Sequence, residues 1–370
     1  MNPTRQKIRI ASPSMQATAI LIVVFFSLSA SSASSSDLFA KILGSHMNDV
    51  AVKVAELPSQ DKDAIVFGLD FSPDGNRLAE VSQSTTINIW DWRDSRIDKS
   101  VSAPEGINPV HVKNGLLYNP NGHLLAICAG RGVGDVFVRL WNTDNWSVAK
   151  DITDSGAGGC DGIDFSPDGR MLVRIVDRAG LLGDKFIVHA AGSSQPIWAL
   201  ATDRFHPVSV AISPDGALAA ISASLTVVQP QQIMHELKIY IVNLQQRKVM
   251  RDISTAALGP LTWSPDGKRI AVAGGIGGIE IFDALTGKNL VSEKIENAGS
   301  MNVRFTPDGR YFINSDLNGM GKGLGVKIWD SQRRRLLQVI PGDIGSIAVS
   351  RDSKYLAVGA TGRTTIWQFK

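Results

Sequence analysis

"FSPDG" at Phe71–Gly75 is the first of six closely related five-residue stretches in the chain. The others are YNPNG from Tyr118, FSPDG from Phe165, ISPDG from Ile212, WSPDG from Trp263 and FTPDG from Phe305, and VSRDS at Val349–Ser353 is a degenerate seventh copy. Successive copies begin 47, 47, 47, 51, 42 and 44 residues apart. A repeat of this period indicates one structural unit per copy, so Val50–Lys370 is predicted to hold seven units and no second domain.

Each unit follows the same pattern of short alternating runs. An apolar run such as VFGLDF precedes the five-residue stretch, a second such as RLAEVS follows it, and a third such as INIWD comes later. A weaker fourth run closes most units. Alternation with a period of two between turn residues predicts four strands per unit. Proline presets φ, and glycine accepts the left-handed conformation, so SPDG is predicted to be the hairpin turn between the first and second strands.

FSPDGNRLAEVSQSTTINIWD and FTPDGRYFINSDLNGMGKGLGVKIWD resemble WD40 repeats, and the resemblance covers the chain from about residue 50 onward. It implies an all-β fold, a seven-bladed β-propeller of four-stranded antiparallel blades whose first strands line a central channel. The aromatic residue near the end of each third strand is then expected to pack between blades. These positions hold Trp90, Trp141, Phe282, Trp329 and Trp367, whereas the third and fourth units have His189 and Val242.

The two ends of the repeat array complement each other. The last unit stops after its third strand, while DVAVKVAEL at Asp49–Leu57 is an alternating run without a unit. The resemblance implies ring closure, so Val50–Leu57 is predicted to pair antiparallel with Arg363–Phe369 and complete the last blade. The Gly-His pair of well-formed WD40 repeats is missing before the first strands, and WSPDGKRIAVAGG is closer to the propeller of TolB proteins. Functions of intracellular WD40 proteins are therefore not transferred.

The first 33 residues have the pattern of an export signal. A basic start, TRQKIRI, precedes the apolar run Ala17–Leu28 and a series of small residues, with cleavage expected near Ala30 or Ala33. The predicted organisation is a signal peptide over 1–33, a linker over 34–48 and a WD40-like propeller over 49–370. This organisation predicts a periplasmic or secreted protein. Membrane contact is expected only in the alternative case, in which the apolar run stays as an uncleaved anchor.

Composition excludes several classes of partner. The net charge of +3 comes from Arg5, Lys7 and Arg9, and the remaining chain has equal numbers of basic and acidic residues, so no nucleic-acid partner is expected. Arg333–Arg335 is either a basic patch or a solvated turn, and the turn is the favoured interpretation. Cys128 and Cys160 are too few for a four-thiolate zinc site. They either form a disulfide, for which the predicted fold places them on one face of neighbouring blades, or are two small buried residues.

Catalytic and metal-binding motifs are missing from the sequence. The six histidines show no metal-ligand spacing, no GxSxG is present, and the glycine-rich stretches connect predicted strands without the helix that a phosphate loop requires. We therefore expect no metal, no cofactor and no enzymatic activity.

The links between second and third strands differ most from unit to unit, and such loops emerge together on one face of a propeller. This face is predicted to bind a protein or peptide, with the chain acting as a monomeric scaffold. The candidate partner-binding residues are Arg131, Asp135, Arg178, Leu181, Leu182, Ile233, Met234, His235, Met320 and Lys322. Two alternatives stay open. One is an enzyme or small-molecule binder in which Asp135, His235 and Asp316 converge at the channel mouth, and the other is a permanent subunit of an envelope complex.

Overall fold

The computed structural model describes residues 49–59, 61–82, 86–103, 115–128, 136–153, 159–177, 185–202, 205–229, 232–274, 278–293, 298–318, 323–342 and 344–370. The chain divides into two units, Met1–His46 and Met47–Lys370, and the fold described below is that of the second unit. Within the ranges given, no helix has the length and apolar character needed to cross a membrane.

The described residues form seven antiparallel sheets of four strands each, which we call blades 1–7. Blade 1 consists of β2 Val66–Phe71, β3 Arg77–Ser82, β4 Thr86–Asp91 and β5 Arg96–Ser102. Blade 2 consists of β6 Leu116–Tyr118, β7 Leu124–Cys128, β8 Val136–Asn142 and β9 Val148–Thr153. Blade 3 consists of β10 Gly159–Phe165, β11 Met171–Asp177, β12 Lys185–Ala190 and β13 Pro196–Ala201. Blade 4 consists of β14 His206–Ile212, β15 Leu218–Gln229, β16 Gln232–Asn243 and β17 Lys248–Ser254. Blade 5 consists of β18 Leu261–Trp263, β19 Arg269–Ala273, β20 Ile279–Asp283 and β21 Asn289–Glu293. Blade 6 consists of β22 Ala298–Phe305, β23 Tyr311–Asn318, β24 Gly323–Asp330 and β25 Leu336–Ile340. Blade 7 consists of β26 Ile344–Val349, β27 Tyr355–Ala360, β28 Arg363–Phe369 and β1 Ala51–Pro58.

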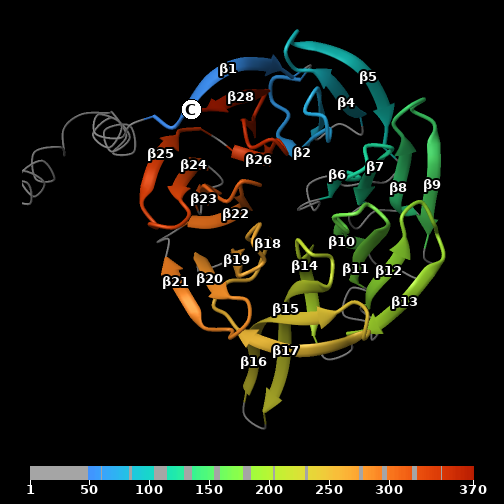
Figure 1. Ribbon diagram of the computed structural model, residues 1–370, viewed down its shortest axis with the longest axis vertical. Helices are drawn as coiled ribbons and strands as arrows, with labels where there is room; N and C mark the ends of the chain where they lie inside the picture. The colour runs from blue at the N-terminus through green and yellow to red at the C-terminus, as the bar shows by residue number, and fades with distance from the viewer. Residues whose placement is uncertain are drawn as a thin grey trace, which may run out of the picture. The chain divides into compact units, whose positions relative to one another are not determined.

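The blades follow one another around a ring, with the first strand of each blade nearest the centre and the fourth strand at the rim (Figure 1). Successive strands of a blade are antiparallel neighbours, as short connections require. The predicted seven-bladed propeller is confirmed.

Ring closure occurs in blade 7, where β1 pairs antiparallel with β28 from Ala51↔Phe369 to Pro58↔Arg363. The Gln338 side chain of blade 6 fixes the start of β1. Its Oε1 accepts hydrogen bonds from the Val50 and Ala51 N–H groups at 2.9 and 2.8 Å, and its Nε2 donates to the Ala51 carbonyl at 2.9 Å. The predicted closure is confirmed, and it covers an edge of β28 that would otherwise be open to pairing with other chains.

The repeated five-residue stretch forms the turn between the first and second strands of each blade. In the first copy, Gly75 has φ of 71° and its N–H donates to the Ser72 carbonyl at 2.8 Å. The Ser72 hydroxyl donates to Asp74 Oδ1 at 2.6 Å and accepts from the Arg77 N–H at 2.8 Å. Because the side chains satisfy the backbone of the turn, the stretch is a structural element, as the sequence predicts.

The aromatic residues near the ends of the third strands occupy one repeated position in the blades. Each of these residues pairs in register with the second residue of the second strand, for example Leu78↔Trp90 and Phe312↔Trp329. His189 and Val242 occupy the same register position in blades 3 and 4. The buried side chains form clusters shared by neighbouring blades, such as the one that joins Ile87 to Leu125. The core is therefore a ring of interfaces between sheets.

The link Leu225–Glu236 joins the second and third strands of the fourth unit, and a link of this kind is predicted to be a loop. That prediction is wrong, because β15 and β16 continue through the link and stay paired as far as Gln229↔Gln232. The link between blade 4's second and third strands is therefore a hairpin.

Candidate functional site

Most of the predicted partner-binding residues lie outside the described part of the chain. This applies to Arg131, Asp135, Arg178, Leu181, Leu182, Met320 and Lys322. The backbones of Ile233 in β16 and Asp316 in β23 are described, whereas their side chains are not. Met234 and His235 are the predicted residues whose side chains the structure places.

Met234 and His235 lie in the two-stranded outer part of blade 4, which we call the hairpin extension and define as 225–229 with 232–237. The first strand of the blade pairs with β15 only up to His206↔Ser224, and β17 pairs with β16 only up to Lys238↔Ser254. Beyond these residues, β15 and β16 pair with each other and with no other strand of the described part of the chain. Figure 1 shows the pair extending past the ring.

The hairpin extension contains both apolar and polar residues. Leu225, Val227 and Met234 share one face because Val227 pairs with Met234 and strand side chains alternate. Met234 is 42% exposed. On the other face, Thr226 Oγ1 lies 3.4 Å from His235 Nδ1. The register also pairs Leu225 with Glu236 and Val228 with Ile233, so apolar and polar residues are not divided between two faces. Among the described residues, no further strand pairs with either outer edge of the extension.

A group of charged side chains on the innermost strands was not predicted. Each lies two residues before the turn that follows the first strand of its blade. We call this group the channel cluster; it consists of Asp70 in blade 1, Asp164 in blade 3 and Arg304 in blade 6. Asp70 Oδ2 accepts a hydrogen bond of 2.7 Å from the Tyr118 N–H, which joins blade 1 to blade 2. Asp164 Oδ2 accepts from the Ile212 N–H at 2.7 Å, which joins blade 3 to blade 4.

Arginine side chains act on the buried carboxylates of this channel cluster. Burial raises the pKa of Asp70 to about 7, while the Tyr118 hydrogen bond and the charges of Arg304 and Arg351 oppose that rise. Burial likewise raises the pKa of Asp164 to about 6. Arg351 Nη1 donates to the Pro120 carbonyl at 2.7 Å and so links the turn of blade 7 to that of blade 2. The cluster joins blades at the narrow centre, and a charged residue within an apolar first strand was its signal in the sequence.

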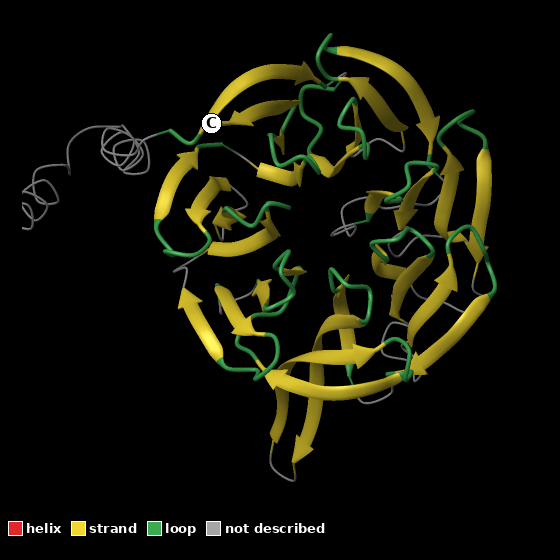
Figure 2. Cartoon of the chain, viewed as in Figure 1, coloured by secondary structure: helices red, strands yellow, loops and turns green. Residues whose placement is uncertain are grey.

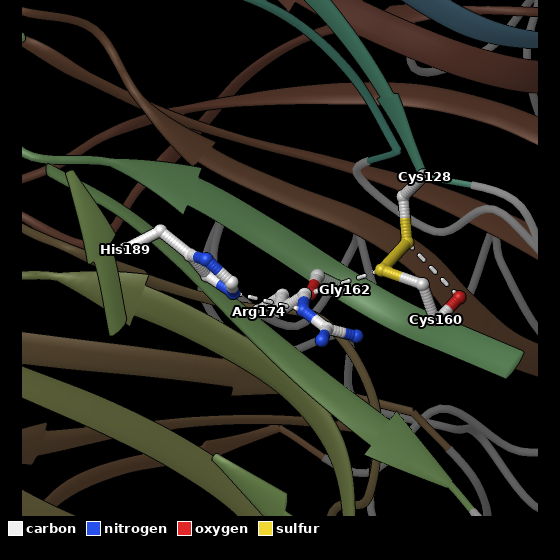
Figure 3. The surroundings of a disulfide bond; sticks show 5 residues. All are labelled: Cys128, Cys160, Gly162, Arg174 and His189. Carbon is white, nitrogen blue, oxygen red and sulfur yellow. Dashed lines mark hydrogen bonds between the residues drawn. A yellow bond between two sulfur atoms is a disulfide. The ribbon is translucent and has the colours of Figure 1, made fainter. Parts of the chain in front are cut away.

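A buried polar pair and a disulfide lie in blade 3 and at its boundary with blade 2 (Figure 3). Cys128 at the end of β7 is bonded to Cys160 near the start of β10, with Cα atoms 5.6 Å apart. Arg174 Nε donates to His189 Nε2 at 3.1 Å, and neither side chain is more than 3% exposed. Burial and the Arg174 charge lower the pKa of His189 to about 4, so this imidazole is neutral at pH 7.

An apolar pocket of about 230 Å³ lies between blades 5 and 6. Its lining includes the apolar residues Leu290, Phe312 and Trp329 and the polar residues Asp330, Ser331 and Arg334. Arg334 Nη1 donates to the Leu290 carbonyl at 2.6 Å, so a guanidinium group is fixed beside an apolar cavity. The pocket therefore combines an apolar wall with one cationic and one anionic residue, Arg334 and Asp330.

Metal-ligating side chains do not gather in the described residues. Among them, no group of three or more histidine, cysteine, aspartate and glutamate side chains is arranged to hold a metal ion.

Comparison with protein families supports the repeat fold. The family described as "WD domain, G-beta repeat" matches residues 52–91, and the family described as "Eukaryotic translation initiation factor eIF2A" matches residues 206–339. No match was found among curated proteins. The first match runs from β1 to β4, so the sequence repeat joins the outer strand of one blade to three strands of the next.

Fold and matches together define a seven-bladed β-propeller of the WD40 type. Propellers of this type are typically non-catalytic scaffolds that bind other proteins. A scaffold role for this chain is therefore the starting point for its function.

Proposed function

We propose that this chain is an exported, monomeric, non-catalytic propeller that binds a protein or peptide partner through the hairpin extension and the neighbouring loops of the same face. The observation that carries the proposal is the hairpin extension itself. An isolated two-stranded hairpin is at most marginally stable in water. The apolar residues of the extension, and its edges to which no described strand pairs, are the features that partner strands and apolar side chains recognise.

The residues of the extension fit a protein partner better than a small charged ligand. Leu225, Val227 and Met234 offer adaptable apolar contact, and methionine is common on surfaces that accept varied partners. The open strand edges offer backbone donors and acceptors in extended register. A peptide that added a strand here would gain hydrogen bonds and side-chain contacts together.

The enzyme alternative requires Asp135, His235 and Asp316 to meet at the channel mouth. His235 instead belongs to the hairpin extension, where Thr226 is its partner across the strands. That arm extends past the ring rather than toward its centre (Figure 1). This position favours the scaffold over the channel-mouth enzyme.

Two features support export. The start of the chain combines basic residues, the apolar run Ala17–Leu28 and small residues, which is the pattern of a secretory signal. The Cys128–Cys160 disulfide is of a kind that persists in oxidising compartments. The match to the eIF2A family covers residues 206–339, which coincide with blades 4–6. A role in translation would instead require the chain to remain in the cytoplasm.

The partner is sought by affinity capture from the native envelope fraction. A variant with Leu225–Glu236 replaced by a short turn should lose the main captured protein, since the extension is gone while the ring remains. The sharper variant is Val227→Thr/Met234→Thr, which keeps strand-forming residues but removes the apolar pair Val227 and Met234. It should lose the same protein.

The matched control is Thr226→Ser/His235→Asn, which changes the opposite face of the same strands. This control should retain the partner. An unchanged list of captured proteins for the turn replacement, or a loss confined to the control, would contradict the proposed apolar contact.

Export is tested by the intact mass of the protein purified from its native host without reductant. The expected mass is that of a chain beginning shortly after Ala30 or Ala33 and lighter by two hydrogens for the disulfide. A mass corresponding to the full chain with two thiols would refute both export by a cleaved signal and oxidation.

A further inference from the structure

Charge is segregated on the face of the propeller that carries the repeated turns. On this face lie the turns between first and second strands and those between third and fourth strands, which appear as loops around the centre and near the rim in Figure 2. We define the basic sector as the turns of blades 4–7, namely 213–217, 244–247, 264–268, 284–288, 306–310, 331–335 and 350–354. These turns contain nine lysine and arginine residues and four aspartates, whereas the corresponding turns of blades 1–3 contain two arginines and four aspartates.

The four aspartates of the basic sector serve the turns that contain them. Asp215 Oδ1 accepts from the Ser213 hydroxyl at 2.6 Å and from the Ala217 N–H at 3.0 Å, and Asp266, Asp308 and Asp352 make the same pair of bonds in their turns. These bonds occupy one carboxylate oxygen of each aspartate. The nine basic residues of the sector outnumber its four aspartates, and Arg333, Arg334 and Arg335 lie together in one exposed turn.

Contacts between blades make the sector continuous. Arg251 of blade 4 donates to the carbonyl groups of Ala284 and Leu285 in blade 5. Arg269 of blade 5 donates to the Ser331 carbonyl at 2.6 Å, and Arg334 of blade 6 donates to the Leu290 carbonyl at 2.6 Å. A carbonyl oxygen orients a guanidinium group without neutralising it. Three basic residues of the sector are paired with carboxylates, namely Arg310 with Asp308, Arg333 with Asp330 and Lys354 with Asp352. The other six of the nine basic residues lie outside these three pairs.

An apolar side chain stands within this positive surface. Leu285, in the turn 284–288, is 82% exposed, although leucine is usually buried. The apolar pocket between blades 5 and 6 is lined in part by Arg334 and Asp330. Cations around an exposed leucine and an apolar cavity form a surface that suits an amphiphile, with an anionic head and an apolar tail.

We propose that the basic sector docks on the surface of an anionic phospholipid bilayer, with Leu285 entering the interface. The seven turns emerge on one face, which lets several blades contact one planar surface. None of these turns contains phenylalanine, tyrosine or tryptophan, the side chains on which single-stranded nucleic acid stacks. The exposed leucine therefore favours a bilayer over a nucleic acid. This inference goes beyond the proposed function and uses none of the residues of the hairpin extension.

The test measures binding of the full chain to vesicles of phosphatidylcholine alone and of phosphatidylcholine with about one third phosphatidylglycerol. The unmodified protein should bind the anionic vesicles more tightly, and added salt should weaken that preference. The test variant is Arg333→Glu/Arg335→Glu, which leaves the Arg334 contact to Leu290 intact. Each basic residue near an anionic surface strengthens binding about fivefold, so this variant should bind at least about 20-fold more weakly.

The matched control is Lys99→Glu/Arg170→Glu, which makes the same change in net charge on exposed residues of blades 1 and 3. It should bind anionic vesicles like the unmodified chain, and unchanged thermal unfolding should show that all variants fold. Leu285→Asn should weaken binding about tenfold, since an apolar contact with the interface is lost. All variants share the same N-terminal segment, so its own affinity for lipid cancels.

Equal loss in the control and test variants would reduce the effect to net charge and overturn the proposal. So would an unmodified chain that does not distinguish the two vesicles. Tighter binding to a single-stranded oligonucleotide than to anionic vesicles, lost in the same test variant, would assign the sector to nucleic acid instead. The hairpin extension is intact in every variant, so failure here is distinguishable from failure of partner capture.

Discussion

His189 occupies a position that tryptophan or phenylalanine fills in five other blades. Its imidazole is buried and accepts a hydrogen bond from Arg174, which itself is almost fully buried. A buried imidazole beside a fixed cation resists protonation, and its pKa is lowered from 6.5 to about 4. The residue thus makes the stability of blade 3 depend on pH in a way that an aromatic residue would not.

The sign of that dependence follows from proton linkage. The unfolded chain protonates this imidazole near pH 6.5 and the folded chain only near pH 4, so folding stability falls as pH decreases between these values. His189→Gln should keep an acceptor for Arg174 but lose this dependence. Relative to the variant, the unmodified chain should lose about 2 kcal/mol of unfolding free energy between pH 7.5 and pH 5. Urea unfolding over this range measures the difference.

Other titrating groups, including Asp70 and Asp164, are common to both chains and cancel in that comparison. Parallel stability curves for the two chains from pH 7.5 to pH 5 would show that the imidazole titrates normally. The sequence located His189 at the aromatic position, but Arg174 became its partner only through the pairing of β11 with β12.

At the scale of elements, the glycine of the repeated turn tolerates a larger side chain better in some blades than in others. Gly309 and Gly169 both have a positive φ, 72° and 71°. A methyl group added at Gly309 would meet no atom within 4 Å, whereas one at Gly169 would collide with Asn119 Oδ1. Asn119 Nδ2 also donates to the Gly169 carbonyl at 2.9 Å, which joins the turns of blades 2 and 3.

Gly309→Ala should therefore cost about 1 kcal/mol of unfolding free energy, because only the left-handed backbone conformation opposes alanine. Gly169→Ala should cost at least about 1 kcal/mol more, since the bridge from Asn119 is displaced as well. Urea unfolding of the two variants gives the comparison. Equal costs would mean that the contact between the two turns contributes nothing to stability.

The two strands of the hairpin extension could not be predicted from the sequence. LTVVQPQQIMHE contains Pro230 and three glutamines, which favour a loop, and its alternation of apolar residues is incomplete. Its strands form because β15 and β16 already pair in the blade and each further pair only extends an existing ladder. Pairing of that kind depends on a neighbour that local sequence patterns do not describe.

At the scale of the whole molecule, one strand closes the ring. Leu57 of β1 is fully buried and packs with residues of blades 7 and 1, including Val66 and Ile366. Leu57→Ala should cost about 3 kcal/mol of unfolding free energy, because it leaves a cavity at the closure. Val54→Thr on the same strand, at a residue that is 45% exposed, should change that free energy by no more than about 0.5 kcal/mol.

Both variants are compared by urea unfolding. Every blade contacts two neighbours, so loss at the closure should lower the midpoint of one common transition instead of producing a separate early step. Identical midpoints for Leu57→Ala and the unmodified chain would show that β1 does not hold the ring together.

The sequence by itself determined the number of blades, the hairpin turns and the closing strand. These features follow from alternation and turn chemistry that act over a few residues and are repeated along the chain, so each copy supports the interpretation of the others. Only the tertiary structure decided which distant groups meet. Arg351 reaches Pro120 across 231 residues of sequence, and the basic turns of blades 4–7 gather on one sector of a face although the chain after residue 33 is formally neutral. The net charge of a chain does not say where its charged residues lie, and the folding of the ring decides which of them are neighbours.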